Sequence, residues 1–353
     1  MSNLAPHIML NKRVIGTSAS PYIIGELSGN HNGSIDMAFK IIDAIADAGA
    51  DAVKLQTYTA DTLTIDCSND DFMIKGGLWD GRTLYDLYEE AHTPWEWHEE
   101  LINHARAKGL DIFSSPFDET AVDFLEEFDL PAYKIASFEA NDVALINKVA
   151  KTGKPIIIST GMANADEIQL SLDTARNAGA ENIVLLHCIS GYPAPISDAN
   201  IATITDMQQR YGVPIGLSDH SIGSAVAVGA VALGACVIEK HVTFDRSLGG
   251  PDAEFSMEPE EFKAFCDDIR NVSDAIGRVH YDKKSSEEKS LVFRRSLYVV
   301  EDINEGDVFT SKNVRSIRPG YGLAPKEYPN ILGKKARYDI KLGTALTREM
   351  FGD

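Results

Sequence analysis

The chain alternates short apolar runs with amphipathic stretches over most of its 353 residues, and this alternation limits the folds open to it. Apolar runs separated by helical periods predict parallel β-strands in βα units. The apolar runs are 22–26, 52–56, 110–114, 132–135, 155–159, 183–187, 214–217 and 236–240. The amphipathic stretches are 35–48, 95–108, 119–129, 142–152, 164–178, 200–211, 221–233 and 259–276.

Eight strands alternating with eight helices predict an α/β protein with a closed (β/α)8 TIM barrel. Glycine follows several of the predicted helices, as expected where a chain leaves a helix in the left-handed conformation. These glycines are Gly49, Gly109, Gly179 and Gly234. A doubly wound open sheet is the alternative, but no GxGxxG motif follows the first apolar run.

Two parts of the chain depart from this pattern. Residues 58–94 form one long loop, and long loops at the carboxyl end of a barrel usually act as lids or specificity elements. After residue 277 the helical period is lost, and short β segments with turns are expected. We therefore expect a barrel domain at 1–281, a linker at 282–289 and a small β-rich domain at 290–353, whose thin core predicts docking on a second subunit.

Composition excludes several classes of protein. A net charge of −20 without a visible basic face argues against a nucleic-acid partner. Four cysteines without CxxC spacing predict reduced thiols in a cytoplasmic protein. Residues 1–20 lack the apolar core of a signal peptide, and no run is long enough to span a membrane.

Two predicted strands that are neighbours in sequence each end in a histidine. His220 and His241 would lie at the carboxyl ends of these strands, which form the catalytic rim of a barrel. Two imidazoles at such positions can share a divalent metal. Strand alternation places Ser218 with His220 and Glu239 with His241, whereas Lys240 would face the helices.

Other strand ends also carry polar side chains. Lys54 and Gln56 share one side of the second strand, and an anion ligand, a structural salt bridge or a Schiff base could explain the lysine. Lys134 and Glu139 could form a pair that holds the barrel together, or serve anion binding and acid–base chemistry. His187 is expected to be a satisfied core residue. Further candidates at strand ends or in the loops that follow are Glu26, Ser115, Ser137, Ser159, Ser190, Tyr192 and Asp252.

Taken in order, these motifs resemble the sialic acid synthase family. The motifs include Val53-Lys54-Leu55-Gln56, Lys134-Ile-Ala-Ser137-Phe-Glu139, Ser159-Thr-Gly-Met162, Gly216-Leu-Ser-Asp-His220, Glu239-Lys-His241 and Arg318-Pro-Gly320. The resemblance covers nearly the whole chain, and its last part is similar to the antifreeze-like (SAF) domain of that family. It implies a transferase that condenses phosphoenolpyruvate with an open-chain amino-sugar aldehyde and releases phosphate.

The resemblance also implies a role for each candidate residue. His220 and His241 would bind a divalent metal, most often Mn2+, with Mg2+ or Co2+ as alternatives. Glu139 and Glu26 would be the catalytic carboxylates. Phosphoenolpyruvate would be held by Lys54, Ser115, Lys134, Ser137, Ser159, Ser190 and Ser218. The sugar would contact Glu26, Gln56, Tyr192, Asp252 and, in a domain-swapped homodimer, Arg318 of the second chain.

Residues 77–88 and 93–98 resemble the members of the family that make pseudaminic acid from 2,4-diacetamido-2,4,6-trideoxy-L-altrose. The N-acetylneuraminate and legionaminate synthases are the alternative, because residue spacing does not encode the sugar. A metal-dependent or Schiff-base aldolase is a more remote alternative, and a non-catalytic ice- or sugar-binding protein is a third. Ser190 and Phe138 depart from the Asn and Gly that are common at these positions of the family.

Overall fold

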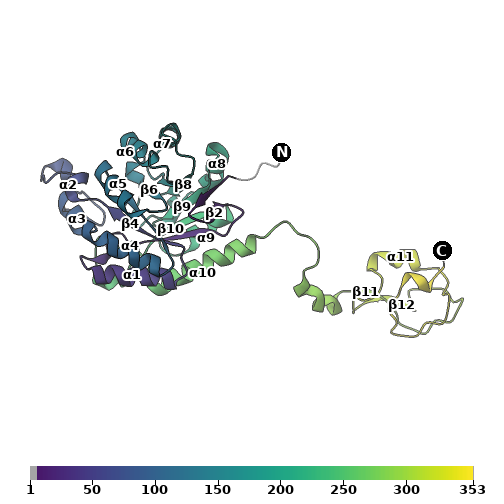
Figure 1. Cartoon of the computed structure of the whole chain (residues 1–353). Helices are drawn as coiled ribbons and strands as arrows, with labels where there is room; N and C mark the ends of the chain where they lie inside the picture. The colour runs from purple at the N-terminus through teal and green to yellow at the C-terminus, as the bar shows by residue number, and fades with distance from the viewer. Residues whose placement is uncertain (1–5, 353) are drawn as a thin grey trace. The chain divides into compact units, whose positions relative to one another are not determined.

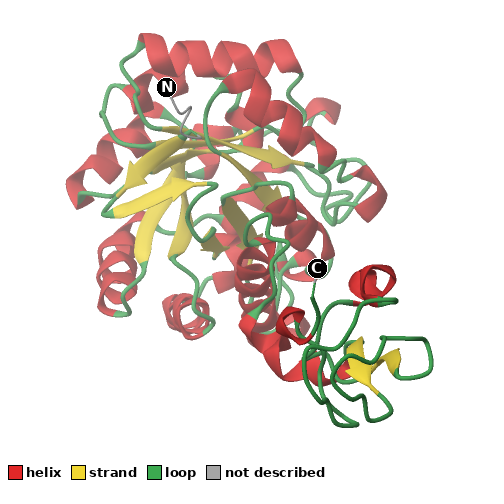
Figure 2. Cartoon of the chain, turned by 90° about the vertical axis from the view of Figure 1, so that its right-hand side faces the viewer, coloured by secondary structure: helices red, strands yellow, loops and turns green. Residues whose placement is uncertain are grey.

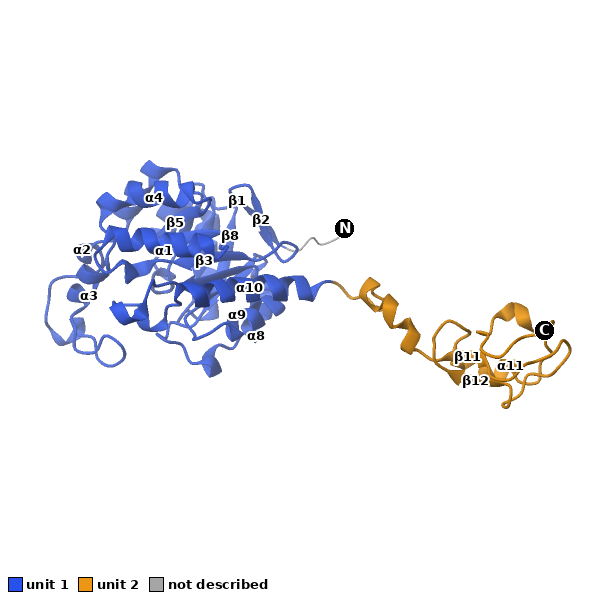
Figure 3. Ribbon diagram, turned by 90° about the horizontal axis from the view of Figure 1, so that it is seen from below, with its two compact units in different colours: residues 1–277 blue, residues 278–353 orange. Residues whose placement is uncertain are grey.

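A computed structural model describes residues 6–352 and divides the chain into two compact units, 1–277 and 278–353 (Figure 3). The first unit is built on a closed parallel barrel in which helices surround the strands (Figures 1 and 2). Its strands are β3 (Tyr22–Glu26), β4 (Ala52–Thr57), β5 (Asp111–Pro116), β6 (Tyr133–Ile135), β7 (Ile156–Ser159), β8 (Ile183–Cys188), β9 (Ile215–Asp219) and β10 (Val237–His241). β10 pairs with β3 and closes the barrel.

The predicted fold class is confirmed, and each predicted strand ends within two residues of the observed one. The helices of the barrel are α1 (Ile35–Asp47), α4 (His98–Ala107), α5 (Glu119–Leu125), α6 (Val143–Ala150), α7 (Ala165–Asn177), α8 (Ala202–Tyr211), α9 (Ala225–Ala232) and α10 (Pro259–Ile276). The four glycines predicted to follow helices all have positive φ, between 78° and 104°. Glycine adopts this conformation without the steric cost of a Cβ atom.

The interior of the barrel is apolar at one end and charged at the other. Tyr22 and Ala52, at the starts of their strands, pack in one cluster with Ile8 and Leu10. The last two residues come from a hairpin, β1 (His7–Leu10) and β2 (Arg13–Gly16), that the sequence analysis did not predict. This apolar cluster fills the barrel interior at the starts of the strands. Every second residue near the carboxyl ends also points inward, and these positions can carry polar side chains.

Residues 58–94, called the excursion below, contain more structure than the predicted loop. They include α2 (Ala60–Leu63) and α3 (Leu84–Ala91), and Met73 bridges to Thr83. Two tryptophan side chains fix the segment to the barrel. Trp79 Nε1 donates to the carbonyl of Pro251 at 2.8 Å, and Trp95 Nε1 donates to the carbonyl of Tyr58 at 3.2 Å.

The second unit has a small core of its own. It contains the antiparallel pair β11 (Ser296–Val299) and β12 (Val314–Ile317), with α11 (Tyr328–Ile331). The expected linker at 282–289 overlaps a 3-10 helix, Ser285–Phe293, because Glu287 accepts the backbone N–H of Lys284 and caps its start. Throughout residues 6–352, the helices are too short or too polar to cross a bilayer.

Candidate active site

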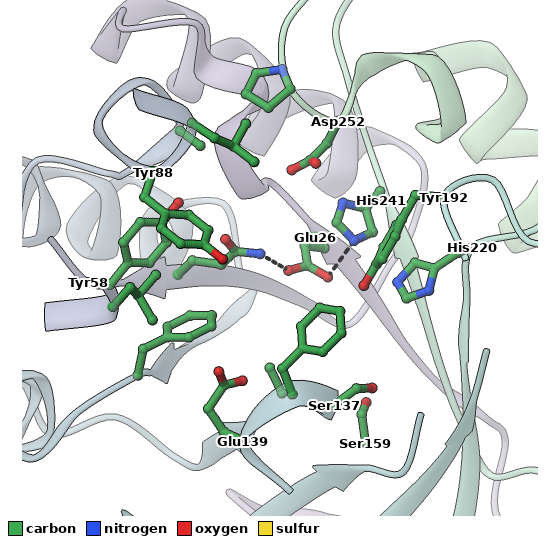
Figure 4. A pocket seen from close by; sticks show the side chains of 18 of the residues that line it. Glu26, Tyr58, Tyr88, Ser137, Glu139, Ser159, Tyr192, His220, His241 and Asp252 are labelled. Carbon is green, nitrogen blue, oxygen red and sulfur yellow. Dashed lines mark hydrogen bonds and ion pairs between the residues drawn. The ribbon is translucent and has the colours of Figure 1, made fainter. Parts of the chain in front are cut away.

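A cavity of about 380 Å³ opens at the carboxyl ends of the barrel strands (Figure 4). Twelve of the predicted site residues line it: Glu26, Lys54, Gln56, Lys134, Ser137, Glu139, Ser159, Tyr192, Ser218, His220, His241 and Asp252. Ser115 and Ser190 do not line this cavity, and Arg318 belongs to the second unit. The strand periodicity has thus brought together residues that lie more than 200 positions apart.

Four buried charged groups meet at the floor of the cavity. Lys54 Nζ lies 3.0 Å from Glu26 Oε2 and 2.9 Å from Glu239 Oε2. Lys134 Nζ lies 3.6 Å from Glu239 Oε1, which also accepts a hydrogen bond from Ser218. Two carboxylates therefore face two ammonium groups, and this balance makes their burial tolerable.

The salt bridge considered for Lys54 is thus present, and Lys134 pairs with Glu239 instead of Glu139. Glu239 was absent from the predicted site residues, although its place two residues before His241 puts it on the same side of β10. This alternation was the signal in the sequence that could have added Glu239 to the site.

The two lysines experience different environments. Burial opposes the charge of Lys54, but Glu239 and Glu26 together raise its pKa above the ordinary value. The pKa of Lys134 is lowered, because burial outweighs the attraction of the more distant Glu239 and Lys54 repels it. Lys134 is therefore the less compensated of the two cations, and a nearby anion would stabilise its charged form.

Several buried hydroxyls at the strand ends and in the loops after them have no hydrogen-bond partner among the described residues. They are the Oγ atoms of Ser115, Ser159 and Ser190. Gly161 follows β7, and a Cβ there would come within 2.2 Å of Ser190 Oγ and 2.7 Å of Ser137 Oγ. The Gly161 N–H donates to Ser137. Since buried hydroxyls are rarely left unpaired, this cluster is suited to a bound anion.

The two histidines each have one ring nitrogen beside an oxygen acceptor. His241 Nε2 lies 3.1 Å from Glu26 Oε2, and His220 Nδ1 lies 3.0 Å from the carbonyl of Ile189. If these nitrogens carry the N–H, Nδ1 of His241 and Nε2 of His220 keep their lone pairs. His241 Nδ1 is buried without a partner among residues 6–352, and the ring centroids are 5.3 Å apart.

This arrangement fits a metal ligated by two histidines, because metal-binding histidines usually donate their second N–H to a carboxylate or carbonyl. In the described part of the chain, no group of three or more His, Cys, Asp or Glu is arranged to hold a metal ion. His220 and His241 would therefore bind a cation only together with non-protein ligands.

Glu139 stands apart from the charged cluster. Its side chain is half-buried, and Oε2 has no hydrogen-bond partner among the described residues. Burial raises the pKa of this carboxyl to about 7. A carboxyl that titrates near neutral pH at the edge of a cavity is suited to proton transfer or to stabilising a transient positive charge.

Tyr192, Gln56 and Asp252 complete the polar part of the wall. The Tyr192 ring lies 4.5 Å from that of His220, and Gln56 Nε2 donates to Glu26 at 2.8 Å (Figure 4). Asp252 accepts a hydrogen bond from Ser28 in the loop after β3. These contacts orient side chains that reach the cavity from strands and from the loops after them.

Some residues of the same motifs have structural positions instead. Asn30 is buried and donates to Val242 and Ser256, tying the loop after β3 to the segment after β10. His187 Nε2 donates to the carbonyl of Ala199 at 2.6 Å, as expected of a satisfied core residue. Lys240 faces the helices, where its Nζ lies 2.9 Å from Asp219.

Fold and site together define a (β/α)8 barrel with charged and hydroxylic side chains at the carboxyl ends of its strands. A model of the NeuB family matches residues 41–281, and a SAF domain model matches 294–352. The chain is 48% identical to the pseudaminic acid synthase of Campylobacter jejuni, over 95% of this chain and 98% of that protein. It therefore belongs to the NeuB family.

Two further similarities support this assignment. The pseudaminic acid synthase of Helicobacter pylori is 44% identical, over 93% of this chain and 97% of that protein. The crystal structure of N-acetylneuraminic acid synthetase from Leptospira borgpetersenii superposes with a TM-score of 0.73 at 31% identity. It covers 83% of this chain and 98% of that one.

Proposed function

We propose that this protein is a pseudaminic acid synthase. It condenses phosphoenolpyruvate with 2,4-diacetamido-2,4,6-trideoxy-L-altrose and produces pseudaminate and phosphate. The observation that carries the proposal is the cavity that Lys54, Lys134 and the unpartnered buried hydroxyl of Ser159 line together. This environment suits a small anion with phosphate and carboxylate groups, and the similarity to named pseudaminic acid synthases at 44–48% identity supports the sugar.

Phosphoenolpyruvate is held by Lys134, Ser137, Ser159 and Ser218 on the cavity wall, together with Lys54. Ser115 and Ser190, which do not line the cavity, supply two further buried hydroxyls. The two carboxylates and two ammonium groups of the floor already balance, so a multiply charged anion needs further positive charge.

A divalent cation at His220 and His241 would supply this positive charge. Relatives of this family generally depend on a metal, and we propose Mn2+ here. When bound, the cation would polarise the aldehyde oxygen of the sugar as a Lewis acid. Glu26 orients His241 through its carboxylate and holds the amide of Gln56, which faces the sugar.

The bond-forming step then relies on Glu139. C3 of phosphoenolpyruvate attacks the aldehyde carbon, and positive charge develops at C2. The ionised carboxylate of Glu139 stabilises this charge. Water adds at C2 and gives one proton to the former aldehyde oxygen, which becomes a hydroxyl. The resulting tetrahedral centre forms the C2 ketone, as its hydroxyl loses its proton and the C–O bond to the departing phosphate breaks. Tyr192 and Asp252 hold the sugar while these bonds change.

The second unit completes the site in this proposal. Arg318, from the second chain of a domain-swapped homodimer, contacts the sugar.

An N,N'-diacetyllegionaminic acid synthase of Campylobacter jejuni is 38% identical to this chain, so legionaminate formation is the second candidate function.

Phosphate release from phosphoenolpyruvate, measured with each candidate sugar and Mn2+, tests the proposal. The L-altrose derivative should give the highest kcat/KM, above the precursors of legionaminate and N-acetylneuraminate. Removal of the metal by a chelator should abolish phosphate release, and Mn2+ should restore it. A higher kcat/KM with another sugar would contradict the assignment, and use of pyruvate without phosphate release would indicate an aldolase.

A further inference from the structure

Two buried charged residues lie directly behind the histidine pair. Asp219 and Lys240 each precede one of the histidines, and strand alternation turns their side chains outward, toward the helices. Lys240 Nζ lies 2.9 Å from Asp219 Oδ2, and the side chains of Lys240 and Asp219 are 0% and 2% exposed. Lys240 Nζ also lies 5.8 Å from the centre of the Phe265 ring in α10. This pair takes no part in the chemistry proposed above.

The ladder between β9 and β10 ends one residue before the two histidines. Its last paired residues are Asp219 and Lys240. Past this point, the His220 carbonyl accepts a hydrogen bond from the N–H of Ala194 in the loop after β8. The strand ladder therefore does not by itself fix the spacing between the two imidazoles.

The side chains of Asp219 and Lys240 continue the connection between the two strands. Asp219 Oδ1 accepts hydrogen bonds from the backbone N–H and the hydroxyl of Ser221, at 2.9 and 2.7 Å, and so closes a turn around His220. Lys240 Nζ donates to Asp219 Oδ2 and to the carbonyl of Ser221, at the two ends of this turn. The turn that carries one imidazole is thus tied to the residue next to His241.

The cavity side supplies a different constraint on the same two rings. His241 Nε2 faces the carboxylate of Glu26 (Figure 4), and His220 Nδ1 faces the carbonyl of Ile189. These contacts set the tilt of each ring, whereas the buried pair acts on the backbone and sets how far apart the rings lie. Metal affinity depends on such outer contacts, because they hold the ligands in the geometry that binds.

We propose that Asp219 and Lys240 are positioning residues, which hold His220 and His241 at the spacing that a shared divalent cation requires. This inference rests on the metal site of the proposed function. Because the side chains of the pair face the helices, the pair acts through the backbone of the two histidines. Its net charge is zero, so removing both charges leaves the charge balance beside the cavity unchanged.

The double variant Asp219→Asn/Lys240→Met tests the inference. It keeps the approximate side-chain shapes and an acceptor for Ser221, and it removes the ionic link without leaving an unpaired buried charge. Mn2+ is titrated into metal-free protein well below Tm. We expect the Kd for Mn2+ to rise by roughly 10- to 100-fold, the usual effect of losing an outer contact of a metal ligand. The absorption bands of bound Co2+ should also move, because the ligand geometry changes.

The variant Arg270→Met is the control for lost stability. It removes an ion pair of 2.7 Å between α10 and Asp51, at the amino end of the barrel, and should lower Tm without changing the Kd for Mn2+. If the double variant does not fold, Asp219→Asn alone replaces it, with the Co2+ bands as the readout. A change of charge alone would weaken binding and leave these bands in place. Unmoved bands and a wild-type Kd in the folded double variant, or unmoved bands in Asp219→Asn, would overturn the inference.

The Mn2+ titration also separates this inference from the proposed function. If no candidate sugar supported phosphate release but the double variant still bound Mn2+ more weakly, the proposed function would fail and the inference would stand. If the wild-type protein released phosphate and both proteins bound Mn2+ equally, the inference alone would be wrong. A wild-type protein that bound no Mn2+ would overturn the inference and the metal-dependent mechanism together.

Discussion

The proposed role of Glu139 can be tested through the pH dependence of activity. Its carboxyl has a pKa of about 7, and the proposed mechanism uses the ionised form. We therefore expect kcat/KM for phosphoenolpyruvate to rise with pH through about 7. Glu139→Gln should lower kcat/KM by at least about a hundredfold and should remove this limb of the pH profile. A variant that kept both the activity and the limb would refute the assigned role.

The raised pKa of Glu139 also predicts that stability falls with rising pH, whereas activity is expected to rise. A carboxyl whose pKa is raised on folding favours the folded state while it is protonated, so this contribution is lost as pH rises through 7. Glu139→Gln should therefore increase Tm at pH 8 and change it little near pH 4.5. The gain corresponds to at most about 3 kcal/mol for a shift from 4.5 to about 7. Thermal unfolding at both pH values measures this effect independently of catalysis.

The histidine pair makes a separate prediction. His220→Ala and His241→Ala should each lower the Mn2+ content after equilibrium dialysis to below about a tenth of the wild-type value, since two imidazoles are the only proposed protein ligands. His280→Ala, which alters an exposed histidine outside the barrel, is the matched control. Full metal content in both site variants would place the metal elsewhere.

At this scale the sequence indicated which residues face the cavity but not how they pair. Ser218, Glu239 and His241 face inward because side chains alternate along β9 and β10, and that alternation is visible in the sequence. The contact of Lys54 with Glu239 joins residues 185 positions apart, and no local pattern specifies it. The unpartnered hydroxyls were likewise invisible, because a missing hydrogen bond is a property of packed neighbours.

Among the elements, the turn after β7 is tightly constrained at Gly161. Gly161→Ala would place a methyl against the hydroxyls of Ser137 and Ser190, both proposed to bind phosphoenolpyruvate. We expect KM for phosphoenolpyruvate to rise by about tenfold, as for the loss of one hydrogen bond to a charged group. KM for the sugar should change much less.

Gly191→Ala provides the control for this prediction. A Cβ at Gly191 meets its nearest atom at 3.5 Å, an ordinary contact, although the residue lies in a neighbouring loop of the site. This variant should bind phosphoenolpyruvate like the wild type. Equal effects of both substitutions would show general loop disruption instead of displaced hydroxyls.

Helices and strands could be predicted where apolar residues recur with a regular spacing, and less well elsewhere. The barrel strands are buried runs bounded by helices with clear apolar faces, so both were recognised. The β1–β2 hairpin has only short strands, and its role in closing the barrel interior depends on contacts with Tyr22 and Ala52. In the excursion, α2 has only four residues, too few for a detectable helical period.

The whole molecule depends, in our proposal, on two chains. If Arg318 enters the site of the second chain, neither Glu139→Gln nor Arg318→Ala alone can form a functional site. A heterodimer of the two variants would nevertheless contain one intact site. After subunit exchange of equal amounts, activity should return to about a quarter of the wild-type value, because half the dimers are heterodimers with one working site of two.

Subunit exchange has a clear negative result. If Arg318 acted within its own chain, each heterodimer would contain one site lacking Glu139 and one lacking Arg318, and mixing would restore nothing. Activity of the mixture equal to the sum of the separate variants would therefore contradict the domain-swapped arrangement. A fully active monomer in sedimentation at assay concentration would contradict it as well.

The central claim is that phosphoenolpyruvate reacts at carbon and loses phosphate by C–O cleavage. Phosphoenolpyruvate labelled with 18O at the bridging oxygen tests it directly, when incubated with 2,4-diacetamido-2,4,6-trideoxy-L-altrose and Mn2+. We predict that the released phosphate carries the label and matches the pseudaminate formed in amount. Unlabelled phosphate would mean P–O cleavage, with free pyruvate as the reacting species, and would contradict the account.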